Sequence, residues 1–260
     1  IDRFYDDEEV VLENTDKMYP NQFIMLISNS NEKKTALAIF VNHDRPIRKL
    51  LNYKNGIWKV KSRNKEQLFA MNLLMDPDVP IVSLVGRAGS GKTLCAIAAG
   101  LEQIMNKDSK KLDLPYKRLV VSRPVQPLGK DIGFLPGSME EKMHPWLMPV
   151  QDNLKFLMGD DRATLEMYME NGQIEVEALT YIRGRSISNA YIIIDESQNL
   201  TTHEIKTIIT RVGEGTKIVF TGDVEQIDNV YVDETTNGLT YAVEKLKNSD
   251  LTGHITLQRG

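Results

Sequence analysis

Hydrophobic and polar positions divide the chain into two parts with different periodicity. From residue 63 onward, short apolar runs typical of buried strands alternate with longer stretches whose apolar residues recur at helical spacing. The predicted strands are residues 81–85, 118–122, 174–179, 190–194, 216–221 and 255–258. The predicted helices include residues 65–75, 92–105, 143–157, 202–212 and 237–247. This alternation predicts an α/β domain over residues 63–260, with a mostly parallel sheet and helices on both faces.

The pattern before residue 63 is shorter and favours strands. Residues 23–28 and 36–41 read as two strands of a small β module that spans residues 20–62. Residues 50–53 and 57–60 flank Lys54–Asn55–Gly56, which predicts a hairpin. The first 19 residues are acidic and lack periodicity, so we expect a linker or tail there.

Composition adds few constraints. The chain has 260 residues and a net charge of −4, so its surface as a whole does not indicate nucleic-acid binding. The single cysteine, Cys95, falls in a predicted helix and is expected in the core, which fits a reducing, cytoplasmic setting. Apolar runs are too short to span a membrane, and no membrane association is expected. The chain begins at Ile1 rather than Met, which we interpret as a piece of a longer protein.

Residues 86–93 form the pattern G-x-x-x-x-G-K-T between a predicted strand and a predicted helix. The glycines let several backbone N–H groups point at one anion, and the amino end of the helix adds partial positive charge. Lys92 is expected to reach the β- and γ-phosphates of ATP, and the Thr93 hydroxyl to ligate Mg²⁺. The residues expected to contact the nucleotide here are Gly86, Arg87, Ala88, Gly89, Ser90, Gly91, Lys92, Thr93 and Leu94.

Two carboxylates follow the apolar strand at 190–194. A buried strand that ends in acid needs a compensating charge, and Mg²⁺ supplies one. Asp195 is expected to hold the ion, and Glu196 to orient and deprotonate the attacking water. A later buried strand ends in Gly-Asp-x-x-Gln, where Gln226 is expected to contact the γ-phosphate or the attacking water and Asp223 to lie behind the metal.

These segments resemble motifs of known proteins. Residues 195–198 and 222–226 are similar to motifs II and III of superfamily 1 helicases, and Gln67 falls where those proteins place an adenine-binding glutamine. Further motifs make the chain resemble the PhoH family over about residues 60–260. They are residues 121–125, 127–137, 141–142, 145–146, 178–185 and 237–240.

The resemblance implies an ATPase with a single RecA-like P-loop core, a family in which ring-shaped hexamers are known. Some members carry a PIN ribonuclease domain and are linked to RNA unwinding and cleavage. Residues 20–60 resemble the stretch that joins the two domains in those members. No PIN domain is evident in this chain, so ribonuclease activity is not expected of it. The family pattern continues past Arg259–Gly260 with Glu-Arg-Ser.

Arginines and a basic run are the candidate contacts with partners. Arg259 is a candidate arginine finger acting on a neighbour's ATP, and Arg183, Arg185 and Arg211 are its rivals. Between residues 45 and 65 there are eight basic residues and no acid, with Tyr53 and Trp58 among them. That composition suits single-stranded RNA, but a solvated hairpin whose aromatics pack on the core is the simpler explanation, since one hairpin is weak evidence.

We therefore expect Mg²⁺-dependent ATP hydrolysis coupled to RNA binding or unwinding in a homo-oligomeric ring. The alternative is a nucleotide-gated binding or assembly module without helicase activity. A small-molecule kinase is disfavoured by the adjacent Asp-Glu pair and the Gly-Asp-x-x-Gln segment. A GTPase is disfavoured because no Asn-Lys-x-Asp segment follows the loop.

Overall fold

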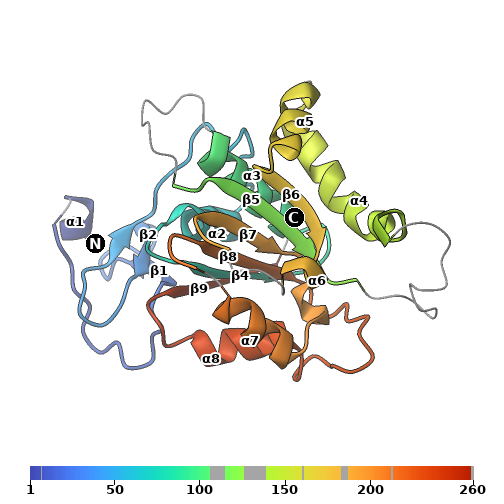
Figure 1. Cartoon of the computed structure of the whole chain (residues 1–260). Helices are drawn as coiled ribbons and strands as arrows, with labels where there is room; N and C mark the ends of the chain where they lie inside the picture. Colours follow the sequence, from blue (N-terminus) through green and yellow to red (C-terminus); the bar gives the residue numbers. More distant parts are fainter. Residues whose placement is uncertain are drawn as a thin grey trace.

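A six-stranded parallel sheet forms the centre of the molecule (Figure 1). The structure is a computed structural model, and it describes residues 1–6, 8–105, 115–125, 139–159, 161–182, 187–211 and 213–258. The strand order is β6-β5-β7-β8-β4-β9. The strands are β4 (Ile81–Gly86), β5 (Arg118–Arg123), β6 (Ile174–Ala178), β7 (Ala190–Ile194), β8 (Lys217–Gly222) and β9 (Thr252–Leu257).

Helices cover both faces of this sheet. On one face lie α2 (Lys65–Met75), α3 (Lys92–Met105), α4 (Met139–Met158) and α5 (Arg162–Glu170). On the other lie α6 (Leu179–Ile182), α7 (Thr202–Thr210) and α8 (Gly238–Leu246), with α7 and α8 below the sheet in Figure 1. The two faces have separate cores because side chains alternate along each strand. On β5, for example, Leu119 and Val121 join one core and Val120 the other. This confirms the predicted α/β, RecA-like core.

The boundaries of most predicted elements agree with the structure to within a few residues. The exceptions are α5 and α6, which we did not predict, and α4, which begins four residues earlier than expected and contains Pro145 and Pro149. Cys95 is buried as expected, and burial raises the pKa of its thiol to about 11. Among the helices in the described ranges, none combines the length and apolarity needed to cross a lipid bilayer.

A small antiparallel sheet of order β1-β2-β3 precedes the main sheet, formed by β1 (Gln22–Ile27), β2 (Thr35–Phe40) and β3 (Arg48–Lys49). The expected acidic tail differs from what the structure shows at the start of the chain. A short helix, α1 (Asp2–Tyr5), places Phe4 in a core with Ala38, Phe40 and Ile47, where it is 4% exposed. Val10, Leu12 and Met18 also pack against this core, and their irregular spacing gives no periodicity that the sequence would reveal.

The predicted hairpin over residues 50–60 is wrong. Residues 57–60 instead form a tight turn that is closed by a bridge between Ile57 and Val60, with Trp58 and Lys59 at positive φ. The side chains explain the difference, because Ile57 is 2% exposed and packs in the main core. The indole N–H of Trp58 donates to the carbonyl of Leu157 on α4 (3.0 Å), so burying these apolar groups outweighs strand pairing.

Trp58 and Tyr53 therefore both pack against the main core. This supports the structural interpretation of the two aromatics in the basic run. Several basic side chains of the run remain exposed and able to contact phosphates, among them Lys59, Lys61 and Arg63.

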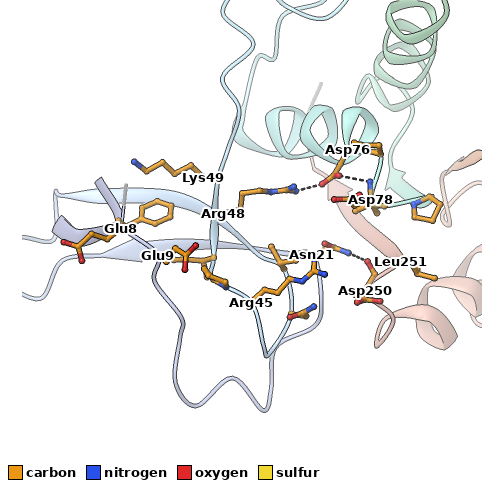
Figure 2. A pocket seen from close by; sticks show the side chains of 18 residues that line it. Glu8, Glu9, Asn21, Arg45, Arg48, Lys49, Asp76, Asp78, Asp250 and Leu251 are labelled. Atoms are coloured by element: carbon orange, nitrogen blue, oxygen red, sulfur yellow. Dashed lines mark hydrogen bonds and ion pairs between the residues drawn. The ribbon is translucent and has the colours of Figure 1, made fainter. Parts of the chain in front are cut away.

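The module docks on the main domain at the amino ends of the core strands. Phe23 stacks on Phe69 of α2 with ring centroids 4.3 Å apart. The Asn21 amide donates to the carbonyls of Asp250 and Thr252, both at 2.8 Å. Arg48 forms an ion pair with Asp76 across a hollow of about 920 Å³ (Figure 2). Since residues before β4 and β9 line this hollow, it lies at the edge of the sheet opposite the glycine loop.

Lys217, the first residue of β8, has a fully buried side chain. Its Nζ donates to the backbone carbonyls of Leu73 (2.7 Å), Asp76 (2.6 Å) and Val79 (2.8 Å). These carbonyls belong to the end of α2 and to the connection that leads to β4, so the lysine ties β8 to both. Burial lowers the pKa of Lys217 to about 7, although the Asp76 carboxylate acts in the opposite direction.

We expect Lys217→Met to remove a pH dependence from the free energy of unfolding. The unfolded lysine has its ordinary pKa of 10.5, so above pH 7 the unfolded state binds more protons than the folded state. The wild-type free energy of unfolding should therefore gain up to about 1.4 kcal/mol per pH unit from this group. Urea unfolding between about pH 7 and 9 measures the slope in both proteins. Parallel slopes would contradict the prediction, whatever stability the variant loses through its three unpaired carbonyls.

Candidate nucleotide site

Three segments expected to bind nucleotide meet at the carboxyl edge of the main sheet. They follow β4, β7 and β8, and β8 lies between the other two strands. Parallel strands end at the same edge, so residues about 100 positions apart in the sequence come into contact there. The sequence places these residues at strand ends, and the sheet order makes them neighbours.

The glycine loop connects β4 to α3, as predicted. Gly89 and Gly91 have φ values of +78° and +85°, which other residues rarely adopt. The Lys92 side chain is 8% exposed, and its Nζ donates to the Arg87 carbonyl at 3.1 Å. The Ser90 hydroxyl is buried without a hydrogen-bond partner among the described residues. Leu94 lies half-buried in the first turn of α3.

Gln67 reaches the glycine loop from α2. Its amide donates to the Ser90 carbonyl (3.1 Å), and its oxygen accepts from the Arg63 backbone N–H (2.8 Å). The side chain is 5% exposed and passes close to Gly91, where a Cβ would meet its amide nitrogen at 3.0 Å. The structure thus shows Gln67 supporting the loop backbone, while a contact with adenine stays a prediction.

Asp195 accepts hydrogen bonds from hydroxyl groups on two other segments. Its Oδ1 accepts from Thr93 of the glycine loop (2.9 Å) and from Thr221 of β8 (2.6 Å). Asp195 is 4% exposed, so a buried carboxylate and two hydroxyl oxygens converge on one point. Oxygen ligands of this kind suit Mg²⁺, which commonly takes one or two protein ligands and completes its shell with phosphates and water. The residues present therefore fit the ion that the sequence predicts.

No cluster of three or more His, Cys, Asp or Glu side chains able to hold a metal occurs within the described part of the chain. A metal bound at Asp195 would thus depend on the nucleotide for further ligands.

Asp223 and Glu225 connect the loop after β8 to the glycine loop. Asp223, which is buried, accepts the Ala88 backbone N–H at 3.1 Å and the Glu225 N–H at 3.0 Å. Glu225 forms an ion pair with Arg87 at 2.9 Å. Asp223 and Glu225 therefore join the glycine loop directly to the segment that ends in Gln226.

Glu196 adopts a left-handed backbone conformation, with φ of 54° and ψ of 39°. Both of its carboxylate oxygens accept hydrogen bonds. Oε1 accepts from Arg123 Nη2 at the end of β5 (3.2 Å), and Oε2 accepts from the Gln198 amide (2.6 Å). The same arginine also donates to the Trp146 carbonyl on α4 (3.4 Å). The expected general base is thus held from two sides.

Gln198 joins the two polar segments. Beyond Glu196, its Nε2 donates to the Gln226 carbonyl (2.9 Å), and its Oε1 accepts from the Asp223 N–H (3.1 Å). Gln226 itself is exposed and lies in the turn that begins at Asp223. The fully buried Gln198 amide therefore links Glu196 to the segment after β8.

The arginine-finger candidates fall mostly outside the described residues, among them Arg259, Arg183 and Arg185. Arg211 is described, and its carbonyl accepts from Ile187 before β7. That position is at the amino edge of the sheet, away from the glycine loop of the same chain.

Sequence reasoning missed three side chains of this site: Thr221, Gln198 and Arg123. Gln198 lay inside a recognised motif without a role, and Thr221 directly precedes the Gly-Asp pair. Arg123 lay within the family motif at residues 121–125, where it was assigned no role in the site. Each contact depends on the order of strands in the sheet, and one sequence without that order does not reveal it.

Comparison with known proteins agrees with this geometry. The sequence model of the family described as "PhoH-like protein" matches residues 59–260, well over half of the chain. The chain belongs to the PhoH family. It is 47% identical over 244 residues to Protein PhoH2 of Bacillus subtilis, covering 93% of this chain and 54% of that protein. It is 40% identical over 204 residues to Protein PhoH2 of Mycolicibacterium smegmatis, covering 78% and 45%.

The chain spans about half the length of these PhoH2 relatives. Two solved helicase structures are also similar over most of the chain. The DUF1998 helicase MrfA bound to DNA has 13% identity and a TM-score of 0.44, covering 92% of this chain and 31% of MrfA. The PRRSV helicase has 12% identity and a TM-score of 0.33, covering 96% and 44%. Membership of the PhoH family and the glycine loop together identify a nucleotide-binding, ATPase-like chain.

Proposed function

We propose that this PhoH-family chain hydrolyses ATP with Mg²⁺ and couples the reaction to single-stranded RNA within a homo-oligomer. The observation that carries the catalytic part is the shared oxygen of Asp195. It joins Thr93 of the glycine loop to Thr221 of β8, with Glu196 as the next residue. Loop, acid and candidate base are thereby assembled in one place.

Each residue has a defined task in this proposal. Backbone N–H groups of residues 86–93 and the Lys92 ammonium bind the phosphates. Thr93 and Asp195 would hold Mg²⁺, which supplies charge neutralisation on the β- and γ-phosphate oxygens when it is bound. Glu196 takes a proton from water, and the water oxygen bonds to the γ-phosphorus as the bond to the β–γ bridging oxygen breaks. Gln226 reports the state of the γ-phosphate to the segment that follows.

The proposed RNA binding and the proposed assembly into a ring are supported by other observations than the hydrolysis. The family resemblance favours both, and the exposed basic side chains of residues 45–65 offer phosphate contacts. Arg259 is proposed as a finger that acts on the ATP of a neighbouring subunit. One RecA-like core in the chain is a further reason to expect assembly, since strand separation by a helicase ordinarily uses two.

One observation favours the alternative, a nucleotide-gated assembly module with slow turnover. Both oxygens of Glu196 already accept hydrogen bonds from Arg123 and Gln198. If this arrangement persisted with ATP bound, hydrolysis would be slow, and binding rather than turnover would be the useful event.

Steady-state ATP hydrolysis with and without single-stranded RNA tests the proposal. We expect Mg²⁺-dependent hydrolysis that RNA stimulates and that chelation of the metal abolishes. Hydrolysis at a rate independent of RNA would favour the assembly module. Sedimentation of the same samples with and without nucleotide reports whether a ring forms. ATP binding with no turnover under any of these conditions would contradict the proposed hydrolysis.

A further inference from the structure

Arg123 ends β5, the strand adjacent to β7 on the side away from the glycine loop. The sheet order from β5 is β7, β8 and then β4, from which the glycine loop extends. The Arg123 guanidinium therefore contacts Oε1 of Glu196 from the β5 side, at 3.2 Å. The remaining oxygen is engaged by Gln198.

The ion pair between Arg123 and Glu196 is only partly exposed to solvent. The side chains of Arg123 and Glu196 are 20% and 31% exposed, whereas the Arg87–Glu225 pair nearby has 74% and 56%. An ion pair that is partly withdrawn from water is weakened less by screening. Arg123 also donates to the Trp146 carbonyl of α4 (3.4 Å), so its guanidinium has a second contact that does not depend on Glu196.

A general base must approach the attacking water within hydrogen-bond distance. With Oε1 held by Arg123 and Oε2 held by Gln198, both carboxylate oxygens of Glu196 are already engaged, and one of these contacts has to be released before Glu196 accepts a proton from water. We infer that Arg123 is a positioning residue that holds Glu196 in a resting orientation, and that its ion pair must open before ATP is hydrolysed. This inference rests on the proposed function of Glu196.

The test compares steady-state hydrolysis by wild type, Arg123→Ala, Arg123→Lys and Arg118→Ala. Arg118 is a matched control, because it begins the same strand and forms an ion pair with Glu175 at 3.3 Å, at the opposite edge of the sheet. We expect Arg123→Ala to raise kcat about fivefold with unchanged affinity for ATP, because the resting orientation is no longer favoured. Arg123→Lys keeps the charge and should stay near the wild-type rate, as should Arg118→Ala.

The outcomes separate this inference from the proposed function. If wild type hydrolyses ATP and Arg123→Ala is slower or unchanged, Arg123 does not restrain Glu196 and only the inference is overturned. If kcat rises equally in Arg118→Ala, the effect is general loosening of β5, and the inference is again overturned. If none of the four proteins hydrolyses ATP although all bind it, the proposed function is overturned as well. If the double variant Arg123→Ala/Glu196→Gln no longer shows the increase in kcat, the effect of Arg123→Ala acts through Glu196.

Discussion

Glu196→Gln is expected to bind ATP as the wild type does and to hydrolyse it about a thousandfold more slowly. Glutamine has almost the same size, and its amide oxygen can still accept from Arg123, whereas its NH2 group cannot accept from Gln198, so the variant keeps one of the two hydrogen bonds. The amide cannot take a proton from water, so the step that Glu196 is proposed to perform is lost. A single-turnover assay combined with fluorescent-nucleotide binding measures the two effects separately.

A control for this prediction is Glu166→Gln, which changes an exposed carboxylate on α5, the helix that leads into the amino end of β6. It should leave both binding and turnover unchanged. Normal hydrolysis by Glu196→Gln would show that another group is the base. Loss of binding in Glu196→Gln would show that the residue serves the nucleotide pocket rather than the chemical step.

Lys92→Ala is expected to raise the Kd for ATP about a hundredfold or more, because a charge-assisted contact with two phosphates is removed. The lysine is 8% exposed, and the Arg87 carbonyl holds its ammonium within the glycine loop. Alanine removes the charge and leaves the loop glycines intact, so the backbone should keep its form. Isothermal titration with ATP and Mg²⁺ gives the change directly.

The matched control is Lys117→Ala, which removes an exposed lysine just before β5. Its affinity for ATP should equal that of wild type. Circular dichroism and thermal unfolding of both variants check that the fold is retained. Wild-type affinity in Lys92→Ala would mean that nucleotide binds elsewhere in the chain, and the proposed site would have to be abandoned.

The sequence predicted the glycine loop and the polar strand ends of the candidate site because these signals are local. A glycine loop between a strand and a helix requires contiguous residues, and both flanks showed the expected periodicity at residues 81–85 and 92–105. Apolar strands that end in Asp195–Glu196 and in Gly222–Asp223 were visible for the same reason. Parallel strands end at one edge, so their convergence followed from fold class.

Local signals also misled in one region. Lys54–Asn55–Gly56 has good turn chemistry, yet the strands on either side did not form. Ile57 and Trp58 gain more by packing on α3 and α4 than by pairing with residues 50–53, and a turn at Trp58–Lys59 allows that packing. Tertiary burial overrides local propensity where large apolar side chains can reach a neighbouring core.

The sequence by itself determined the α/β class, the glycine loop, and the acids and glutamine at the ends of the core strands. The tertiary structure alone decided the contacts among them. It placed Arg123 against Glu196, Gln198 between two motifs, and Thr221 on Asp195. It also brought Lys217 under the end of α2. These pairings depend on which strands are adjacent, and strand order is fixed by packing over the whole sheet rather than by any short stretch of residues.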